Sequence, residues 1–133
     1  MIVGLGIDLV EVERIRSTYE KHGERFLSRI LRPDEITYCL SHREPAQYLA
    51  VRFAAKEAIA KAFGTGISAE LSWQDMEIVR RESGQPFVIL HGAGLKLQAE
   101  RGVQTIWISL SHTAQHATAV AVLESAGMSG NDE

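Results

Sequence analysis

The chain has 133 residues, of which 45% are apolar and one is a cysteine, and its formal net charge is −3. This length predicts a single domain with a hydrophobic core, and no apolar run is long enough to cross a membrane. The first residues lack the basic leader and the cleavage site expected of a signal peptide. Cys39 is expected in the core, and as a single cysteine it excludes an internal disulfide. Both observations predict a cytoplasmic location.

The first expected element is a β-strand over residues 2–10. Because side chains alternate along a strand, one face is apolar and the other carries two glycines beside an acid. The apolar face comprises Val3, Leu5, Ile7 and Leu9, and the other comprises Gly4, Gly6 and Asp8. Two interpretations of the glycine face stay open. The missing side chains admit a ligand beside Asp8, or they let a helix pack closely while Asp8 caps the next helix.

Three short helices are expected next, over residues 13–22, 24–31 and 33–41. Gly23 suits the C-terminal cap of the first helix, and Pro33 followed by two acids suits the start of the third.

The segment from Arg14 to Arg32 is strongly basic, although the rest of the chain is acidic. It carries a charge of +4, which leaves −7 for the remainder. A solvated helix surface is the simpler interpretation, and a docking patch for an acidic partner is the alternative. Nucleic acid is not expected, because an acidic chain lacks the broad positive field that such binding uses.

A long helix is expected over residues 45–63, ending at the turn Gly64-Thr65-Gly66. Glu57 stands within an otherwise apolar helical stripe, a costly place for a carboxylate unless a cation or hydrogen bonds meet it. Lys61 lies one turn further along the helix. It either forms an ion pair with Glu57, which would stabilise the helix by about 0.3 kcal/mol, or supplies positive charge to a phosphate. Lys56 faces away from this stripe. The turn offers backbone amides to a phosphate, although a simple helix stop explains it equally well.

The remainder of the chain is rich in expected strands. A hairpin is predicted over residues 73–81 and 86–90, a helix over 93–101, and antiparallel strands over 104–111 and 117–124. Helices early and strands late favour an α+β fold with a small antiparallel sheet rather than a doubly wound one.

Two further features follow the predicted strands. His112 is placed to contact a nucleotide phosphate or shuttle a proton, although a hydrogen-bonded structural role is as well supported. Residues 125–133 are small and polar and are expected to form a disordered tail, which leaves one domain over residues 1–124.

Two sequence motifs match one known family. Residues 6–15 (GIDLVEVERI) and 53–66 (FAAKEAIAKAFGTG) resemble the two signatures of the holo-acyl-carrier-protein synthases, which are 4'-phosphopantetheinyl transferases. The motifs are complete, correctly ordered and at the usual separation, and the resemblance extends from residue 1 to about 124. Arg32 departs from the family, where Thr is common, and is expected to add to the basic face.

The resemblance implies a reaction. Members of this family transfer the 4'-phosphopantetheine arm of coenzyme A to a serine of apo-acyl carrier protein in fatty acid biosynthesis and release adenosine 3',5'-bisphosphate. Breaking a pyrophosphate link requires charge neutralisation and in-line attack, which Mg2+ supports with only one or two carboxylate ligands. The resemblance also implies a homotrimer with active sites between neighbouring subunits.

The resemblance further assigns roles to residues. Asp8 and Glu57 match the metal ligands, and Lys61 matches a catalytic lysine that neutralises the pyrophosphate. Coenzyme A is expected to contact Lys61, His112 and the turn Gly64-Thr65-Gly66. Because acyl carrier proteins are acidic, the docking patch is expected to centre on Arg14, Lys21 and Arg25.

Several alternatives stay open at this stage. The general base for the acceptor serine is Glu57 or a metal-bound water. A broader transferase that serves peptide or polyketide synthases is disfavoured by the short chain, since such enzymes resemble two of these units fused. A non-catalytic module that binds acidic partners leaves the two carboxylates unexplained. A phosphohydrolase using the same metal site is the remaining alternative.

Overall fold

The computed structural model describes residues 1–127 and confirms the predicted order of helices and strands. The strands are β1 (Ile2–Glu11), β2 (Met76–Arg80), β3 (Pro86–Leu90), β4 (Val103–His112) and β5 (His116–Ser125). The α-helices are α1 (Val12–His22), α2 (Glu24–Ile30), α3 (Pro33–Leu40), α4 (Pro45–Phe63) and α5 (Gly92–Glu100). The architecture is therefore the predicted α+β class.

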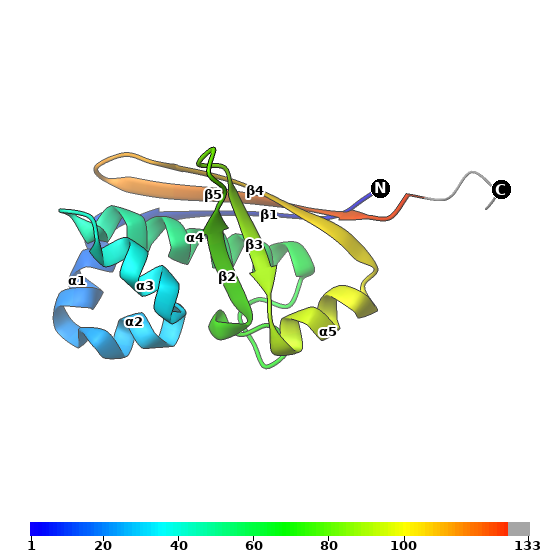
Figure 1. The fold of residues 1–133 in the computed structure, drawn as a ribbon, viewed down its shortest axis with the longest axis horizontal. Helices are drawn as coiled ribbons and strands as arrows, with labels where there is room; N and C mark the ends of the chain where they lie inside the picture. Colours follow the sequence, from blue (N-terminus) through cyan, green and yellow to red (C-terminus); the bar gives the residue numbers. More distant parts are fainter. Residues whose placement is uncertain (128–133) are drawn as a thin grey trace.

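The strands form two antiparallel sheets rather than one. The larger sheet has the order β1-β5-β4, and β2 and β3 form a separate hairpin. In Figure 1 the three-stranded sheet lies along the upper side, α4 runs beneath it, and α1, α2 and α3 gather at the left end. The hairpin crosses in front of α4. Thus α4 is enclosed between the sheet and the other elements.

Helix α4 begins and ends at residues suited to those positions. Pro45 occupies its first turn, where a missing N–H costs nothing, and Gly64 ends it in the left-handed region at φ 79°. Its interior is rich in alanine, which forms helix well and lets neighbouring backbones approach closely. Leu49, Ala54 and Ile59 are fully buried, which makes α4 the centre of the hydrophobic core.

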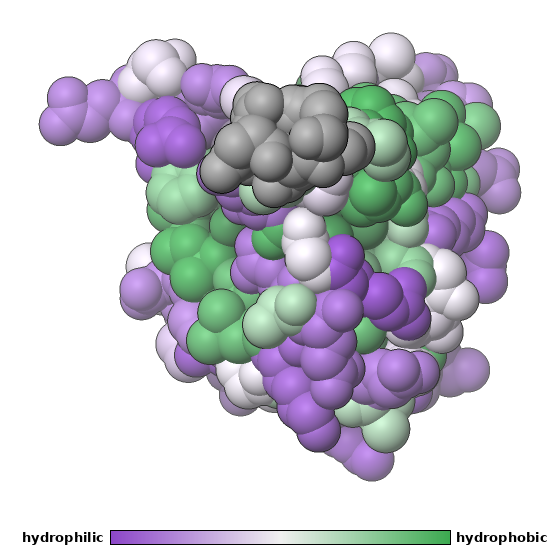
Figure 2. All heavy atoms as spheres, turned by 90° about the vertical axis from the view of Figure 1, so that its right-hand side faces the viewer, coloured by the Kyte–Doolittle hydropathy of each residue, from purple (hydrophilic) through white to green (hydrophobic). Residues whose placement is uncertain are grey.

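The apolar face predicted for the first strand is exposed in the monomer. Leu5, Ile7 and Leu9 are 65–67% exposed, whereas Gly6 on the opposite face is buried against α4. Apolar side chains gather at the upper right of Figure 2, which views the end of the molecule where the chain starts. The core is therefore built on the glycine face of β1, and no element within residues 1–127 covers the apolar face of β1.

Some local predictions need correction. Residues Trp73–Asp75 form a short 3-10 helix, η1, instead of the start of a strand, because the Asp75 carboxylate accepts a hydrogen bond from the Ser72 N–H at 2.9 Å. Ser125, predicted to begin the tail, belongs to β5 and donates its N–H to the Met1 carbonyl at 2.8 Å. Residues 128–133 of that predicted tail lie outside the described residues.

Arg32 does not extend the basic face as predicted. Its Nη1 donates to the Gln74 carbonyl at 2.7 Å, and its Nε lies 3.9 Å from Glu77 Oε1. Arg32 therefore links the start of α3 to η1 and β2. No helix within residues 1–127 is both long and apolar enough to span a membrane.

Candidate metal and phosphate site

The site is formed where β1 crosses α4. Asp8 lies on the same face of β1 as Gly4 and Gly6, and its side chain is only 15% exposed. A Cβ atom at Gly6 would overlap the Ala58 carbonyl oxygen and lie 2.7 Å from the Ala62 nitrogen. The glycines thus allow the α4 backbone to approach β1, as the close-packing interpretation proposed. Asp8 does not cap α1, whose N-cap residue is Glu11.

Lys61 contacts β1 instead of pairing within its own helix. Its Nζ donates to Asp8 Oδ1 at 2.9 Å and to the Ile7 carbonyl at 3.1 Å. The Lys61 side chain is 53% exposed, so its ammonium is accessible from solvent while it contacts Asp8. Of the two sequence interpretations, the intrahelical pair with Glu57 is therefore wrong, and a cation held beside Asp8 replaces it.

Glu57 lies one helical turn before Lys61, on the same face of α4. Burial raises the pKa of Glu57 above its usual value, the nearby Asp8 charge raises it further, and Lys61 lowers it. No ion pair within residues 1–127 involves Glu57. Glu57 and Asp8 thus share one region in which two negative charges are incompletely compensated.

This pair of carboxylates fits a hard divalent cation such as Mg2+. Mg2+ binds oxygen ligands, takes one or two carboxylates, and keeps waters or substrate phosphates in its other positions. A cation here would offset the burial and the Asp8 repulsion that together raise the pKa of Glu57. Within the described part of the chain, no group of three or more His, Cys, Asp or Glu side chains is placed to hold a metal. Asp8 and Glu57 would therefore need water or phosphate oxygens to complete a shell.

The turn after α4 differs from the expected cradle of free amides. The N–H of Gly64 donates to the Lys61 carbonyl at 2.9 Å, and those of Thr65 and Gly66 both donate to the Ala60 carbonyl at 3.2 Å. The three amides thus cap the helix, which supports the helix-stop interpretation. Whether coenzyme A contacts this turn stays a prediction.

His112 lies away from the two carboxylates in a single chain. It pairs with Ala117 at the end of β4, and its ring lies 5.6 Å from that of Tyr48 near the start of α4. Tyr48 and Glu57 are nine residues apart on one helix, a rise of about 13 Å. The His112 ring therefore lies beside a part of α4 well before Glu57, and no ion pair within residues 1–127 joins His112 to Asp8 or Glu57.

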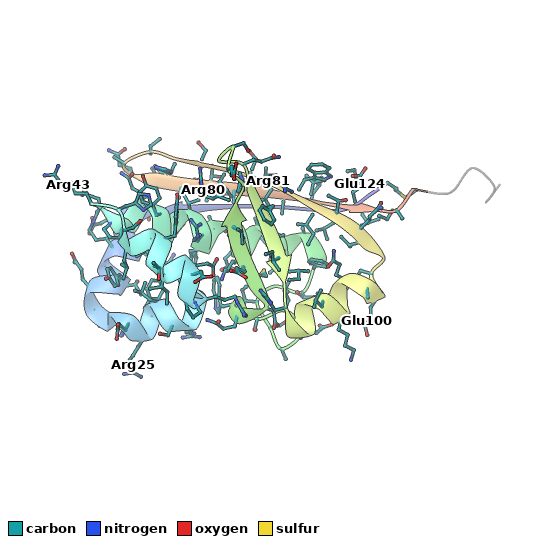
Figure 3. All side chains as sticks on the ribbon, viewed as in Figure 1. Arg25, Arg43, Arg80, Arg81, Glu100 and Glu124 are labelled. Atoms are coloured by element: carbon teal, nitrogen blue, oxygen red, sulfur yellow. The ribbon has the colours of Figure 1, made fainter. Side chains whose placement is uncertain are left out.

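The predicted docking residues lie on α1 and α2. Arg14, Lys21 and Arg25 are exposed, and none has an ion pair among the described residues. Figure 3 shows Arg25 pointing outward below α2. Arg14 and Lys21 lie two turns apart on one face of α1, and Arg25 lies on the next helix, α2.

A cavity of about 540 Å³ opens beside Arg25, and the sequence patterns did not predict it. Its lining includes two cations and four large apolar side chains. These are Arg25, Arg29, Phe26, Ile30, Phe53 and Trp73. Phe53 lies one turn before Glu57, so the cavity adjoins the helix face that carries the carboxylate. No local sequence pattern indicates this cavity, because its arginines and aromatic residues come from three separate segments of the chain.

A second feature missed from the sequence is a buried ionic network beneath this cavity. Lys56 is fully buried and its Nζ lies 2.7 Å from Glu35 Oε1. Arg52 is also buried, with its Nε 4.0 Å from Glu35 Oε2 and its guanidinium 4.3 Å from the centre of the Tyr38 ring. The neighbouring Cys39 is fully buried, which confirms it as a core residue, and burial raises the pKa of its thiol to about 11. The one available signal was a lysine inside an apolar helix.

Two carboxylates, Asp8 and Glu57, and the ammonium of Lys61 thus come together where β1 crosses α4. A sequence model of the 4'-phosphopantetheinyl transferase superfamily matches residues 4–121. The chain belongs to this superfamily, and is thus an enzyme of the phosphopantetheinyl transferase class.

Individual relatives agree in sequence and in fold. The holo-[acyl-carrier-protein] synthase of Chlamydia trachomatis serovar L2 is 47% identical over 121 residues, which cover 91% of this chain and 98% of that protein. The crystal structure of the Neisseria meningitidis synthase matches with a TM-score of 0.88 and 38% identity, covering 94% of this chain and all of that one. The Helicobacter pylori synthase, solved with coenzyme A, matches with a TM-score of 0.81 and 33% identity, covering 90% and 99%. The family and fold class predicted from the sequence are confirmed.

Proposed function

We propose that this chain transfers the 4'-phosphopantetheine group of coenzyme A to a serine of apo-acyl carrier protein, releasing adenosine 3',5'-bisphosphate, with Mg2+ as its metal. The names of its relatives and the coenzyme A complex of one of them support this reaction. The observation that carries the proposal is the Asp8–Lys61 contact beside Glu57. A place in fatty acid biosynthesis and a cytoplasmic location stay predictions from the resemblance and the sequence.

Asp8, Glu57 and Lys61 would act together on the pyrophosphate of coenzyme A. Asp8 and Glu57 would hold Mg2+, which when bound supplies positive charge to phosphate oxygens. The half-exposed Lys61 ammonium would exchange part of its contact with Asp8 for a phosphate oxygen and orient it. Glu57, which forms no ion pair within residues 1–127, is also a candidate for the base that accepts the serine proton, with a metal-bound water as the alternative.

The cavity beside Arg25 supports docking of an acidic carrier protein. Arg25 and Arg29 would meet its acidic groups, and the apolar lining would take its hydrophobic side chains. The position of Phe53 one turn before Glu57 would direct the carrier serine towards the carboxylates. Arg14 and Lys21 would extend this patch along α1.

A homotrimer with active sites between subunits is part of the proposal. The outer face of the sheet carries continuous rows of exposed or half-exposed side chains, because Leu5 pairs with Val122 and Val122 with Trp107 across the three strands. An exposed apolar surface of this kind favours burial against another copy. The position of His112 beside Tyr48, nine residues before Glu57 on α4, supports a site completed by His112 of a neighbouring copy.

Intact-mass measurement of an apo-acyl carrier protein tests the reaction directly. The carrier is incubated with this protein, coenzyme A and Mg2+, with a chelator-treated sample and the Glu57→Gln variant in parallel. We expect a gain of one phosphopantetheinyl group that the chelator abolishes and the variant reduces strongly. Release of phosphopantetheine without any acceptor would indicate a phosphohydrolase, and no gain with several folded carriers would reject the transferase.

A further inference from the structure

Lys56 is a fully buried lysine whose three N–H donors are all engaged. Its Nζ donates to the Ile30 carbonyl at 2.7 Å, to Glu35 Oε1 at 2.7 Å and to the Trp73 carbonyl at 3.1 Å. A buried ammonium is costly unless it is paired and hydrogen-bonded, and Lys56 meets both conditions. The residue is therefore a fixed link among segments that are far apart in the sequence.

Two of these acceptors belong to residues that line the cavity beside Arg25 and come from different elements. Ile30 is the last residue of α2, Trp73 is the first residue of η1, and both residues line the cavity. The Trp73 ring packs against Phe53, with ring centres 5.0 Å apart. A single ammonium on α4 thus holds the α2 wall and the η1 wall at a set separation.

Glu35 fixes this link to the rest of the fold. Its Oε1 also accepts the Arg32 N–H at 2.8 Å, and its Oε2 accepts the Ile78 N–H at 2.9 Å. The Lys56 ammonium consequently has a defined position relative to α3 and β2. Because Glu57 follows Lys56 on α4, the same short stretch of helix joins the cavity walls to the carboxylate that faces Asp8.

We propose that Lys56 is a positioning residue that sets the width of the cavity between α2 and η1 and so aligns a docked carrier protein with Glu57. This inference rests on the proposed function of the cavity as the carrier site. Lys56 itself does not touch the substrates, because it is fully buried. Its effect is expected on carrier recognition and not on coenzyme A binding.

Steady-state kinetics of Lys56→Met test the proposal. Methionine keeps the length and burial of the side chain but donates no hydrogen bond, so the two walls lose their common anchor. We expect the KM for the carrier protein to rise about tenfold while the KM for coenzyme A changes less than twofold. Assays run well below the melting temperature of the variant, so that loss of folded protein does not enter the result.

Lys56→Gln provides a second variant in case Lys56→Met does not fold. Glutamine is shorter and has two donors, so the KM for the carrier protein should rise by an intermediate amount. If position 56 served only hydrophobic packing, Lys56→Gln would not have a lower KM for the carrier protein than Lys56→Met.

Arg52→Met is the matched control. It removes a buried cation of the same helix whose Nε lies 4.0 Å from Glu35 Oε2 and has no hydrogen-bond partner in the described part of the chain. We expect a loss of stability without a change in the carrier KM. If Lys56→Met lowers stability or the active fraction but leaves both KM values unchanged, Lys56 is merely structural and the proposal is overturned. If the wild-type protein itself fails to modify the carrier, the proposed function fails instead.

Discussion

The backbone of β1 at Gly6 packs directly against the backbone of α4 at Ala58, with no side chain between them. Any Cβ at Gly6 would occupy the space of the Ala58 carbonyl oxygen. This contact brings the strand that carries Asp8 against the helix turn that carries Glu57 and Lys61. The glycines of the first motif therefore serve the chemistry indirectly, by setting the distance between two elements.

Gly6→Ala should consequently damage both the fold and the site. The added methyl group must push α4 away from β1, and overpacking at a backbone contact should cost about 3 kcal/mol. Chemical denaturation measures the loss, and turnover should fall further than the folded fraction does, because Lys61 loses its reach to Asp8. Gly127→Ala is the control, since a Cβ there meets nothing within 4 Å. Wild-type stability for Gly6→Ala would contradict the close packing.

Lys61→Met separates the catalytic role of this lysine from its structural role. The Asp8–Lys61 pair is half-exposed on the lysine side, so its loss should change stability by less than about 1 kcal/mol. If Lys61 neutralises charge on the pyrophosphate, kcat/KM for coenzyme A should fall about 100-fold. Lys96→Met, an exposed lysine on α5, should behave like the wild type. A loss below threefold for Lys61→Met would assign the residue to structure alone.

Glu57→Gln should stabilise the metal-free protein at neutral pH. Folding raises the pKa of Glu57, so the folded chain binds this proton more tightly than the unfolded chain. That favourable contribution is complete at low pH and is lost as the pH rises through the raised pKa. The gain from Glu57→Gln should be less than about 1 kcal/mol at pH 7.5 because the site is partly solvated, and should vanish towards about pH 4, near the pKa of an unfolded glutamate.

Thermal melting with and without Mg2+ checks this prediction. Mg2+ should raise the melting temperature of the wild type, since it binds the folded pair of carboxylates, and should have a smaller effect on Glu57→Gln. An Mg2+ response that is equal in both proteins would remove Glu57 from the metal site.

The elements of the fold were predictable because their signals are local. Pro45 and Gly64 mark the two ends of α4, and apolar alternation marks β1. The same alternation could not show which face of β1 is buried. The sequence makes Leu5 and Ile7 look like core residues, yet the glycine face packs on α4 because only a face without side chains admits a helix backbone.

The site was predictable in part. The family resemblance implied that Asp8, Glu57 and Lys61 share one site, and the structure brings Asp8 and Lys61 into contact. Spacing along the helix also allowed Glu57 as a partner of Lys61. It could not show that Lys61 contacts Asp8 instead, because helical spacing contains no information about the approach of β1. The links from Lys56 to Ile30 and Trp73 span 26 and 17 residues, and such long-range contacts leave no periodic pattern in the sequence.

Arg14→Glu should weaken binding of the carrier protein without affecting coenzyme A. Reversing one charge in the proposed docking patch should raise the KM for the carrier about tenfold and reduce its salt dependence. Kinetics at two salt concentrations measure both effects, and the charge reversals at Lys21 and Arg25 should act in the same direction.

The control for this charge reversal lies on the same helix. Arg16→Glu makes the same charge change on α1, but Arg16 already donates to Glu13 Oε1 at 2.6 Å and so is less available to a partner. Its effect on the carrier KM should be several times smaller than that of Arg14→Glu. Equal effects would indicate a diffuse attraction, and unchanged carrier affinity for Arg14→Glu would reject the docking role.

Leu5→Glu tests whether the outer face of the sheet joins copies of the chain. Leu5 is 67% exposed in the monomer, and a charge there would have to be buried in any interface built on this face. We expect light scattering after size exclusion to show a trimer for the wild type and a smaller species for Leu5→Glu. Turnover should fall with the mass, because His112 of a neighbouring copy would be lost from the site. Leu95→Glu, on α5 and 54% exposed, is the matched control and should retain both mass and activity. A Leu5→Glu protein with wild-type mass would place the interface elsewhere.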